Sequence, residues 1–256
     1  MSTFKFFPEG WKSEEIEDTK DILQGIVKNC DKDYNLHVEL KNGMHGIIPR
    51  QEIEAINVDE KGYPKENLCI GKVHKYVQFK LKEKDGDKLI FSRKDVQQEV
   101  LNSVKTDLKV GDNIKGIVKN ITPYGAFIDI GGGVVGLAYI EDLSVARIKT
   151  PYERLKIGQN VNIVVKSINR ETGKISLSYK DTLGTWEENA KKFSVGMNTK
   201  GIIRETEKNK NGIFIELTPN LVGMAEYKEG LKYGEKVDLY IKKIDYDKKK
   251  VKVVLL

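Results

Sequence analysis

Residues 120–143, NITPYGAFIDIGGGVVGLAYIEDL, contain a short alternating strand that follows a Pro-Tyr-Gly turn. Successive side chains of a strand face opposite sides of its sheet. If Ile128 and Ile130 point into a core, Phe127 must point outward together with Asp129. The pattern therefore predicts a strand that holds a phenylalanine ring toward water, which is a position that needs a reason.

The same arrangement occurs three times along the chain. The alternating segments HVEL at 37–40, FIDI at 127–130 and FIEL at 214–217 are each followed by a glycine-led segment at 46–49, 136–139 and 223–226. Each repeat of about 70 residues consists of five strand-like runs separated by Gly, Asn and Asp turns. This spacing predicts an all-β chain of three tandem five-stranded barrels of the OB-fold type, whose strand 2–3 face commonly binds oligonucleotides.

Two helical segments separate the repeats. After Ser92, four aliphatic residues between Val96 and Val104 fall on one helix face, and Ser92 with Asp95 resembles an N-terminal cap. The segment TWEENAKKF at 185–193 opens on a T-x-x-E capping box. The predicted divisions are an N-terminal arm (1–18), a first domain with its linker helix (19–107), a second domain (108–182), and a linker helix with a shortened third domain (183–256).

The net charge of +6 is distributed unevenly over the 256 residues. Counting Lys and Arg against Asp and Glu gives −2 for residues 1–107, +5 for 108–180 and +3 for 181–256. The segment with the outward phenylalanine is thus the most basic, which fits either a polyanion partner or an ordinary surface of solvated lysines. No signal-peptide pattern and no membrane-spanning run is present, so we expect a soluble, cytoplasmic protein. We expect a monomer, because the sequence shows no self-complementary apolar face. Cys30 and Cys69, each in an apolar strand-like run, are expected to be buried thiols rather than a disulfide.

The second repeat resembles the RNA-binding domain first described in ribosomal protein S1. The other two repeats resemble it more weakly, and together the similarity covers nearly the whole chain after about residue 18. The matching residues of the second repeat are Val110-Gly111, Gly116, Val118, Tyr124-Gly125-Ala126-Phe127, Asp129, Gly136-Leu137, Ile140, Gly158, Val161 and Ile175-Ser176-Leu177-Ser178.

The resemblance implies a set of RNA-contacting residues in the second repeat. In the family, bases stack on an aromatic before the glycine, on the phenylalanine after it, and on a ring of strand 3. These positions fall on Tyr124, Phe127 and Tyr139 here, and the polar and basic positions near strands 4 and 5 fall on Asn169 and Lys174. Tyr139 replaces a histidine and Asn169 an aspartate of the family pattern, and outward parity supports Phe127 but does not place Tyr139. Lys119, Lys166 and Arg170 are candidates for further phosphate contacts.

The other two repeats depart from this pattern. The first keeps Tyr34 and His37 as candidate rings but has Pro49 at the position of Tyr139, and it resembles degenerate domains that dock onto a protein partner. The third keeps Phe214 but has Glu226 at the position of Tyr139. The aromatic arm before the first repeat, residues 4–11, either folds back on that repeat or anchors a protein partner.

Motifs of other functional classes are incomplete. Gly131, Gly133 and Gly136 spell G-x-G-x-x-G, but a strand-like run follows instead of the helix that a dinucleotide site needs. His37, His45 and His74 lack metal-ligand spacing. No cofactor, metal or enzymatic activity is expected.

The residues and the resemblance together predict a non-enzymatic protein that binds single-stranded RNA, including mRNA, by stacking and basic contacts. The expected setting is translation, with the N-terminal domain as a candidate contact to the small ribosomal subunit. Two alternatives stay open: an RNA regulator acting in decay or transcription, and a protein-interaction scaffold whose barrels no longer bind RNA.

Overall fold

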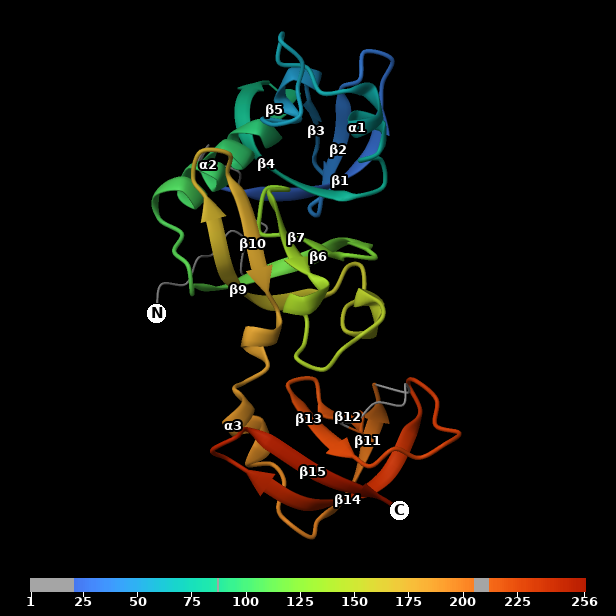
Figure 1. Cartoon of the computed structure of the whole chain (residues 1–256). Helices are drawn as coiled ribbons and strands as arrows, with labels where there is room; N and C mark the ends of the chain where they lie inside the picture. The colour runs from blue at the N-terminus through green and yellow to red at the C-terminus, as the bar shows by residue number, and fades with distance from the viewer. Residues whose placement is uncertain (1–20, 87, 205–211) are drawn as a thin grey trace. The chain divides into compact units, whose positions relative to one another are not determined.

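The computed structural model of the whole chain (Figure 1) describes residues 21–86, 88–204 and 212–256. The described residues form three closed barrels of five strands each, which confirms the predicted fold class. The predicted N-terminal arm lies outside the described residues. No helix in the described part of the chain is long and apolar enough to cross a membrane.

Each barrel is built with the same strand order. The first strand pairs with the second and closes on the fourth, while the third pairs in parallel with the fifth. The strands of the first barrel are β1 (Leu23–Cys30), β2 (Leu36–Leu40), β3 (His45–Ile48), β4 (Tyr76–Asp85) and β5 (Lys88–Ser92). Those of the second are β6 (Asn113–Thr122), β7 (Gly125–Asp129), β8 (Val135–Tyr139), β9 (Asn160–Asn169) and β10 (Lys174–Ser178). Those of the third are β11 (Asn198–Ile203), β12 (Ile213–Thr218), β13 (Leu221–Ala225), β14 (Lys236–Asp245) and β15 (Lys250–Leu255).

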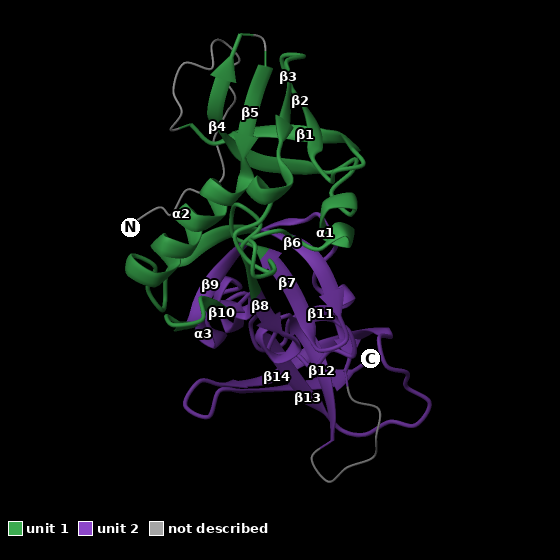
Figure 2. Cartoon of the chain, turned by 90° about the horizontal axis from the view of Figure 1, so that it is seen from above, with its two compact units in different colours: residues 1–116, 129–136, 168–175 green, residues 117–128, 137–167, 176–256 purple. Residues whose placement is uncertain are grey.

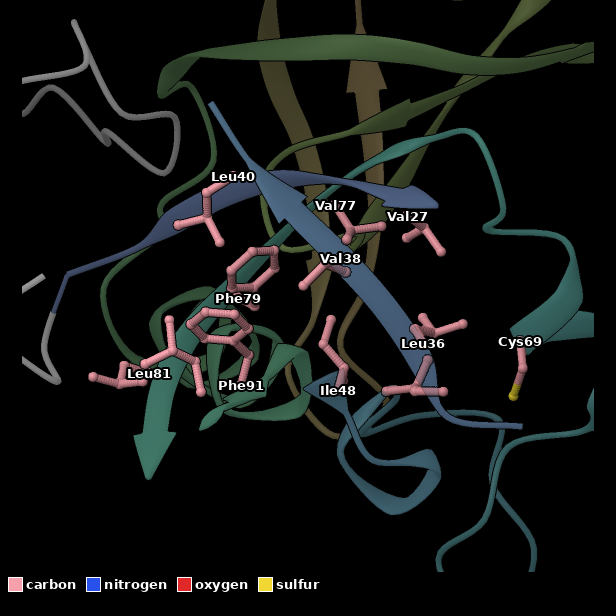
Figure 3. Packing of buried hydrophobic residues seen from close by; sticks show 12 residues of the cluster. Val27, Leu36, Val38, Leu40, Ile48, Cys69, Val77, Phe79, Leu81 and Phe91 are labelled. Atoms are coloured by element: carbon pink, nitrogen blue, oxygen red, sulfur yellow. The ribbon is translucent and has the colours of Figure 1, made fainter. Parts of the chain in front are cut away.

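The alternating residues fill the barrels as their periodicity predicts. Val38 and Leu40 of β2 are buried in the first barrel, where the rings of Phe79 and Phe91 lie 4.5 Å apart at its centre (Figure 3). Ile213 and Ile215 of β12 are likewise fully buried in the third barrel. The outward positions between them are thereby fixed, because a slip of one residue would turn the apolar set toward water.

Both predicted linker helices are present. In α2 (Arg93–Thr106) the Ser92 side chain accepts a hydrogen bond from the Asp95 N–H at 3.0 Å, which is the predicted cap. In α3 (Trp186–Ala190) Thr185 and Glu188 form the predicted capping box. This helix ends earlier than residue 193, because the Phe193 N–H bonds the Ala190 carbonyl and tightens the last turn. The structure also contains five short helices that the sequence analysis did not predict. They are α1 (Glu66–Ile70), η1 (Arg50–Glu52), η2 (Ile140–Asp142), η3 (Pro151–Glu153) and η4 (Lys180–Thr182).

The two cysteines are free thiols, as predicted, but their settings differ. Cys30 ends β1 and is partly exposed, whereas Cys69 is fully buried and lies in α1. The strand-like interpretation of the run around Cys69 was therefore wrong, since a short apolar run does not distinguish a strand from a buried helical turn. Burial raises the pKa of the Cys69 thiol, which keeps it protonated.

The chain forms two compact units (Figure 2). Unit 1 contains the described residues of 1–116 together with 129–136 and 168–175, and unit 2 contains 117–128, 137–167 and 176–256. Within unit 1 the Gly132 N–H donates to Gln78 Oε1 at 2.7 Å, and Arg170 donates to the carbonyl oxygens of Val104 and Leu108. The predicted domain bounds divide the chain by its sequence repeats, whereas the compact units divide it by contacts. The predicted bounds therefore stay a prediction.

Candidate nucleic-acid interface

The strand β7 has the side-chain alternation predicted from its sequence. Ala126 and Ile128 are fully buried, and Phe127 between them is only partly buried. Asp129, on the same side as Phe127, is buried because its carboxylate turns toward the following glycines. It accepts hydrogen bonds from the N–H groups of Gly131 at 2.8 Å and Gly133 at 3.2 Å. The glycine-rich motif is thus a hairpin turn into β8, as predicted, and the ring of Phe127 stays on the outer surface.

Three rings gather around β7 and β8. Tyr124, in the turn before β7, is 53% exposed, and its ring meets the Phe127 ring edge to face at a centroid distance of 6.1 Å. Tyr139, at the end of β8, is 41% exposed. The Ile140 N–H donates to the Tyr124 carbonyl at 2.9 Å, which places the backbone of the residue after Tyr139 against Tyr124. The rings of Tyr124 and Phe127 are thus in contact, and Tyr139 lies on the adjoining strand, next to the residue that bonds Tyr124; we call these three residues the ring face.

Gly125 makes this arrangement possible. A Cβ atom at this position would lie 2.4 Å from the Ala138 carbonyl oxygen and 3.0 Å from the Tyr139 Cα. The backbones of β7 and β8 thus approach more closely than any side chain allows. A side chain at this position would therefore push the β8 backbone at Ala138 and Tyr139 away from β7.

The outward position of Tyr139 is a finding that parity did not supply. On β8 the buried positions are Gly136 and Ala138, so Val135, Leu137 and Tyr139 share the outer side. Leu137 is partly buried there, although its aliphatic side chain favoured the core in a reading from sequence. The sequence feature that could have indicated the outward side is the small residue Ala138, because a small side chain fits the interior where two strands of a narrow barrel approach each other.

Asn169, Arg170 and Lys174 lie on the β9–β10 hairpin, in unit 1. The Asn169 carboxamide oxygen accepts hydrogen bonds from the N–H groups of Glu171 at 3.1 Å and Thr172 at 2.9 Å, so it shapes the turn. The Arg170 guanidinium binds carbonyl oxygens at the C-terminal end of α2. Lys174 is exposed at the start of β10. Arg170 thus serves a structural contact, and Asn169 shapes the turn.

Lys166 and Lys119 lie on outer positions of β9 and β6. The Lys166 ammonium lies 2.8 Å from both carboxylate oxygens of the fully buried Asp142, and Lys180 approaches the same carboxylate at 3.2 Å. The hydrogen bond to Asp142 raises the pKa of Lys166, so this lysine is charged throughout the neutral range. If Lys166 contacted a phosphate, its ammonium group would bind the phosphate and Asp142 at the same time.

The candidate rings of the first barrel have internal partners. The Arg50 guanidinium covers the Tyr34 ring at 4.7 Å from its centroid and lies 5.6 Å from the Tyr63 ring. The His37 Nε2 atom lies 3.2 Å from an Asp31 carboxylate oxygen. Tyr34 therefore has a cationic neighbour and His37 an acidic one, whereas Tyr124 and Tyr139 of the second barrel have exposed rings.

In the third barrel the ring position is again outward. Phe214 of β12 is 37% exposed, between the fully buried Ile213 and Ile215. Glu216, two residues on, is buried and binds two arginines. Its Oε2 atom lies 2.6 Å from both Arg154 and Arg204. Among the described residues, no group of three or more His, Cys, Asp or Glu side chains is arranged to hold a metal ion.

The chain belongs to the S1 RNA binding domain family, whose model matches residues 18–94 and 107–180. These ranges correspond to the first and second barrels. The residues around Tyr124–Phe127 carry the resemblance to this family, and the two matches agree with it.

Named relatives agree with the family. The chain is 37% identical over 194 residues to the small ribosomal subunit protein bS1 of Staphylococcus aureus strain MRSA252, covering 68% of this chain and 49% of that protein. It is 28% identical over 232 residues to the bS1 of Chlamydia muridarum, covering 85% and 40%. The chain thus spans about half the length of the Staphylococcus relative and less than half of the Chlamydia relative. The solution structure of GSP13 from Bacillus subtilis is 32% identical over 31% of this chain and 61% of that one, with a TM-score of 0.30.

Proposed function

We propose that the chain binds single-stranded RNA without catalysing a reaction, and that the ring face of the second barrel is its main stacking site. The observation that carries this proposal is the gathering of Tyr124, Phe127 and Tyr139 on one side of a rigid β7–β8 pair. Every base has a flat π-face, and a stack of a base on an aromatic side chain contributes roughly 1–3 kcal/mol. Membership in the S1 RNA binding domain family supports the same ligand.

Basic side chains of the second repeat are further proposed contacts for the RNA backbone. The net charge of +5 for residues 108–180 attracts the phosphate backbone. Lys174 supplies an exposed ammonium, with Asn169 as a polar neighbour in the same hairpin, and Lys119 lies outward on β6. These contacts position the strand without reading its sequence, so we expect broad sequence tolerance.

The proposed setting is translation in the cytoplasm, with mRNA as the ligand, because the relatives carry the name of a small ribosomal subunit protein. Contact with that subunit would fall to the first barrel, whose rings are already engaged by Arg50 and Asp31. This covered surface also favours the second candidate function, protein docking, for the first barrel alone. Sedimentation of the chain with purified small subunits, against free mRNA fragments, separates a ribosomal role from a free regulatory one.

The test of RNA binding is fluorescence anisotropy with a labelled single strand of about a dozen nucleotides. The wild type should prefer it to a duplex of the same length. Phe127→Tyr should bind like the wild type because the ring is retained. Phe127→Leu should lose about 1–3 kcal/mol, since it keeps apolar volume but removes the π-face. Equal binding by the Leu and Tyr variants would show that Phe127 is not a stacking residue.

A further inference from the structure

The turn between β12 and β13 of the third barrel contacts the second barrel through Asn220. This side chain is 6% exposed, and its carboxamide bonds residues 36 to 75 positions away in the sequence. Its Nδ2 atom donates to the Lys180 carbonyl at 2.7 Å and the Gly184 carbonyl at 2.9 Å, and its Oδ1 atom accepts from the Val145 N–H at 3.4 Å. One side chain of the third barrel thus holds two earlier segments of the chain.

Lys180 continues this connection into the second barrel. Its ammonium group donates to the Glu141 carbonyl at 2.9 Å and lies 3.2 Å from an oxygen of the fully buried Asp142 carboxylate. Both residues belong to η2, the short helix that directly follows Tyr139 of the ring face. The Tyr179 N–H also donates to the Asp142 carbonyl at 2.8 Å. The segment around Lys180 is therefore bound to η2 by main-chain and side-chain contacts.

The place of η2 limits where Tyr139 can lie. Tyr139 is the N-cap residue of η2, and the Ile140 N–H donates to the Tyr124 carbonyl at 2.9 Å. Leu143, at the other end of η2, is fully buried. A shift of η2 would therefore move the backbone of Tyr139 relative to Tyr124. All of these residues belong to unit 2, and so does Asn220 (Figure 2).

The residue type at position 220 fits this connection. Asparagine is common in turns because its side chain bonds its own backbone, whereas the bonds of Asn220 reach other segments. A carboxamide offers both N–H donors and an oxygen acceptor, and Asn220 uses both kinds of group. An apolar side chain of similar size would leave two carbonyls and an N–H without these partners, which is costly where they are buried.

We propose that Asn220 is a positioning residue for RNA binding, because it holds Tyr139 in place through Lys180 and η2. The third barrel thus supports the ring face of the second barrel from outside that face. The role of Tyr139 rests on the proposed function, whereas the hold of Asn220 on η2 is independent of it. Changes along a contact network of this kind alter a coupled binding step by about twofold to thirtyfold.

Hydrogen exchange of the full chain tests the hold on η2 without RNA. The variant is Asn220→Ala, with Asn220→Ser as a milder change should the first not fold. The control is Asn189→Ala, since Asn189 is another buried asparagine, 2% exposed, whose carboxamide bonds the residues before α3 and the Thr218 hydroxyl. The amides of Ile140 and Leu143 should exchange at least about threefold faster in the Asn220 variant than in the control.

Anisotropy with a labelled single-stranded RNA of about a dozen nucleotides then measures the effect on binding. Asn220→Ala should weaken binding at least about threefold, whereas Asn189→Ala should bind like the wild type. Tyr139→Ala alone should weaken it at least about fivefold, through the loss of one stack. In the Tyr139→Ala background, Asn220→Ala should have no further effect on affinity, because its effect acts through that ring.

Unchanged exchange at Ile140 and Leu143 in the Asn220 variant would overturn the inference, whatever the RNA result. Equal losses of affinity from Asn220→Ala with and without the Tyr139 ring would also overturn it, because they would show a general structural role. If Asn220→Ala speeds exchange but Tyr139→Ala binds RNA normally, the hold on η2 stands and the proposed function of Tyr139 falls. The two failures are therefore distinguishable.

Discussion

The strands β7 and β12 carry almost the same local sequence, Phe127-Ile128-Asp129 and Phe214-Ile215-Glu216. In both, the isoleucine is fully buried and the ring lies on the outer side. Their acidic residues differ in what they bind. Asp129 accepts two N–H groups of its own glycine turn, whereas Glu216 binds Arg204 and Arg154. A common barrel therefore fixes where a side chain points, and the neighbours decide what it does.

The surroundings of the two phenylalanines follow from that difference. Phe127 has Tyr124 against it and Tyr139 on the adjoining strand, so the second barrel presents several rings. Phe214 has Met224 as its register partner and basic residues nearby, so the third barrel presents a hollow. In unit 2, the third barrel's Arg204 and Glu216 also bind Glu153 and Arg154, which come from η3 of the second barrel and the residue after it.

The largest effect is expected from breaking the ion pairs around Glu216. Arg204→Met leaves Glu216 and Glu153 without one partner, in a setting where the Arg204 side chain is 4% exposed. Removing one member of a buried ion pair destabilises a protein by about 3–5 kcal/mol, and Arg154 compensates in part, so we expect about 3 kcal/mol by urea unfolding. Lys200→Met breaks the exposed pair between Lys200 and Asp238 of the same barrel and should cost less than about 1 kcal/mol. A loss for Arg204→Met no larger than that for Lys200→Met would contradict the importance of the buried pairs.

An intermediate effect is expected where β7 and β8 approach each other. Gly125→Ala should destabilise the chain by about 1–3 kcal/mol, because the added Cβ meets the Ala138 carbonyl and the backbone must shift. It should also weaken RNA binding, since Tyr139 moves with that backbone. Gly46→Ala in the first barrel, where the added Cβ would lie 2.2 Å from a Phe91 ring carbon, is a control that should destabilise without changing RNA affinity. Unfolding and anisotropy measured on the same samples distinguish the two.

A smaller effect is expected from pH. Burial alone would raise the pKa of Glu153, but hydrogen bonds from the Lys149 N–H, Tyr233 and Arg204 outweigh it and hold the pKa below its ordinary 4.5. A carboxyl whose pKa is lowered by folding stabilises the protein above its unfolded pKa and loses that contribution as pH falls through the folded one. The stability difference between the wild type and Glu153→Gln should therefore be constant above about pH 5 and shrink below 4.5. A difference that grows in acid would contradict this sign.

The fold was largely predictable because strand periodicity and turn residues recur in three copies. Alternation alone placed Phe127, Phe214, Val38 and Leu40 on the correct sides, and the capping patterns located α2 and α3. Alternation does not place Tyr139, because the aliphatic Leu137 lies on the same side of β8 and its residue type favours a core position. In the structure the buried residues of β8 are the small Gly136 and Ala138.

The interaction partners of the charged candidate residues could not be predicted from the local sequence. Arg170 binds the Val104 carbonyl of α2 from 66 residues away, and Lys166 binds Asp142 from 24 residues away. Nothing in the segments around either residue specifies such contacts, because they arise from how separate strands and helices pack. The Arg50 that covers Tyr34 was missed for the same reason.

The most direct test compares equivalent residues of two barrels in one binding assay. Tyr124→Ala with Phe127→Ala removes two open rings, and Tyr34→Ala with His37→Ala removes the equivalent pair of the first barrel, which has internal partners. With a single-stranded RNA of about a dozen nucleotides at matched salt, the first variant should lose about 2 kcal/mol or more, roughly thirtyfold, and the second should stay within about twofold. Equal affinities for both variants and the wild type, with only a salt dependence remaining, would contradict the assignment of the ring face as the stacking site.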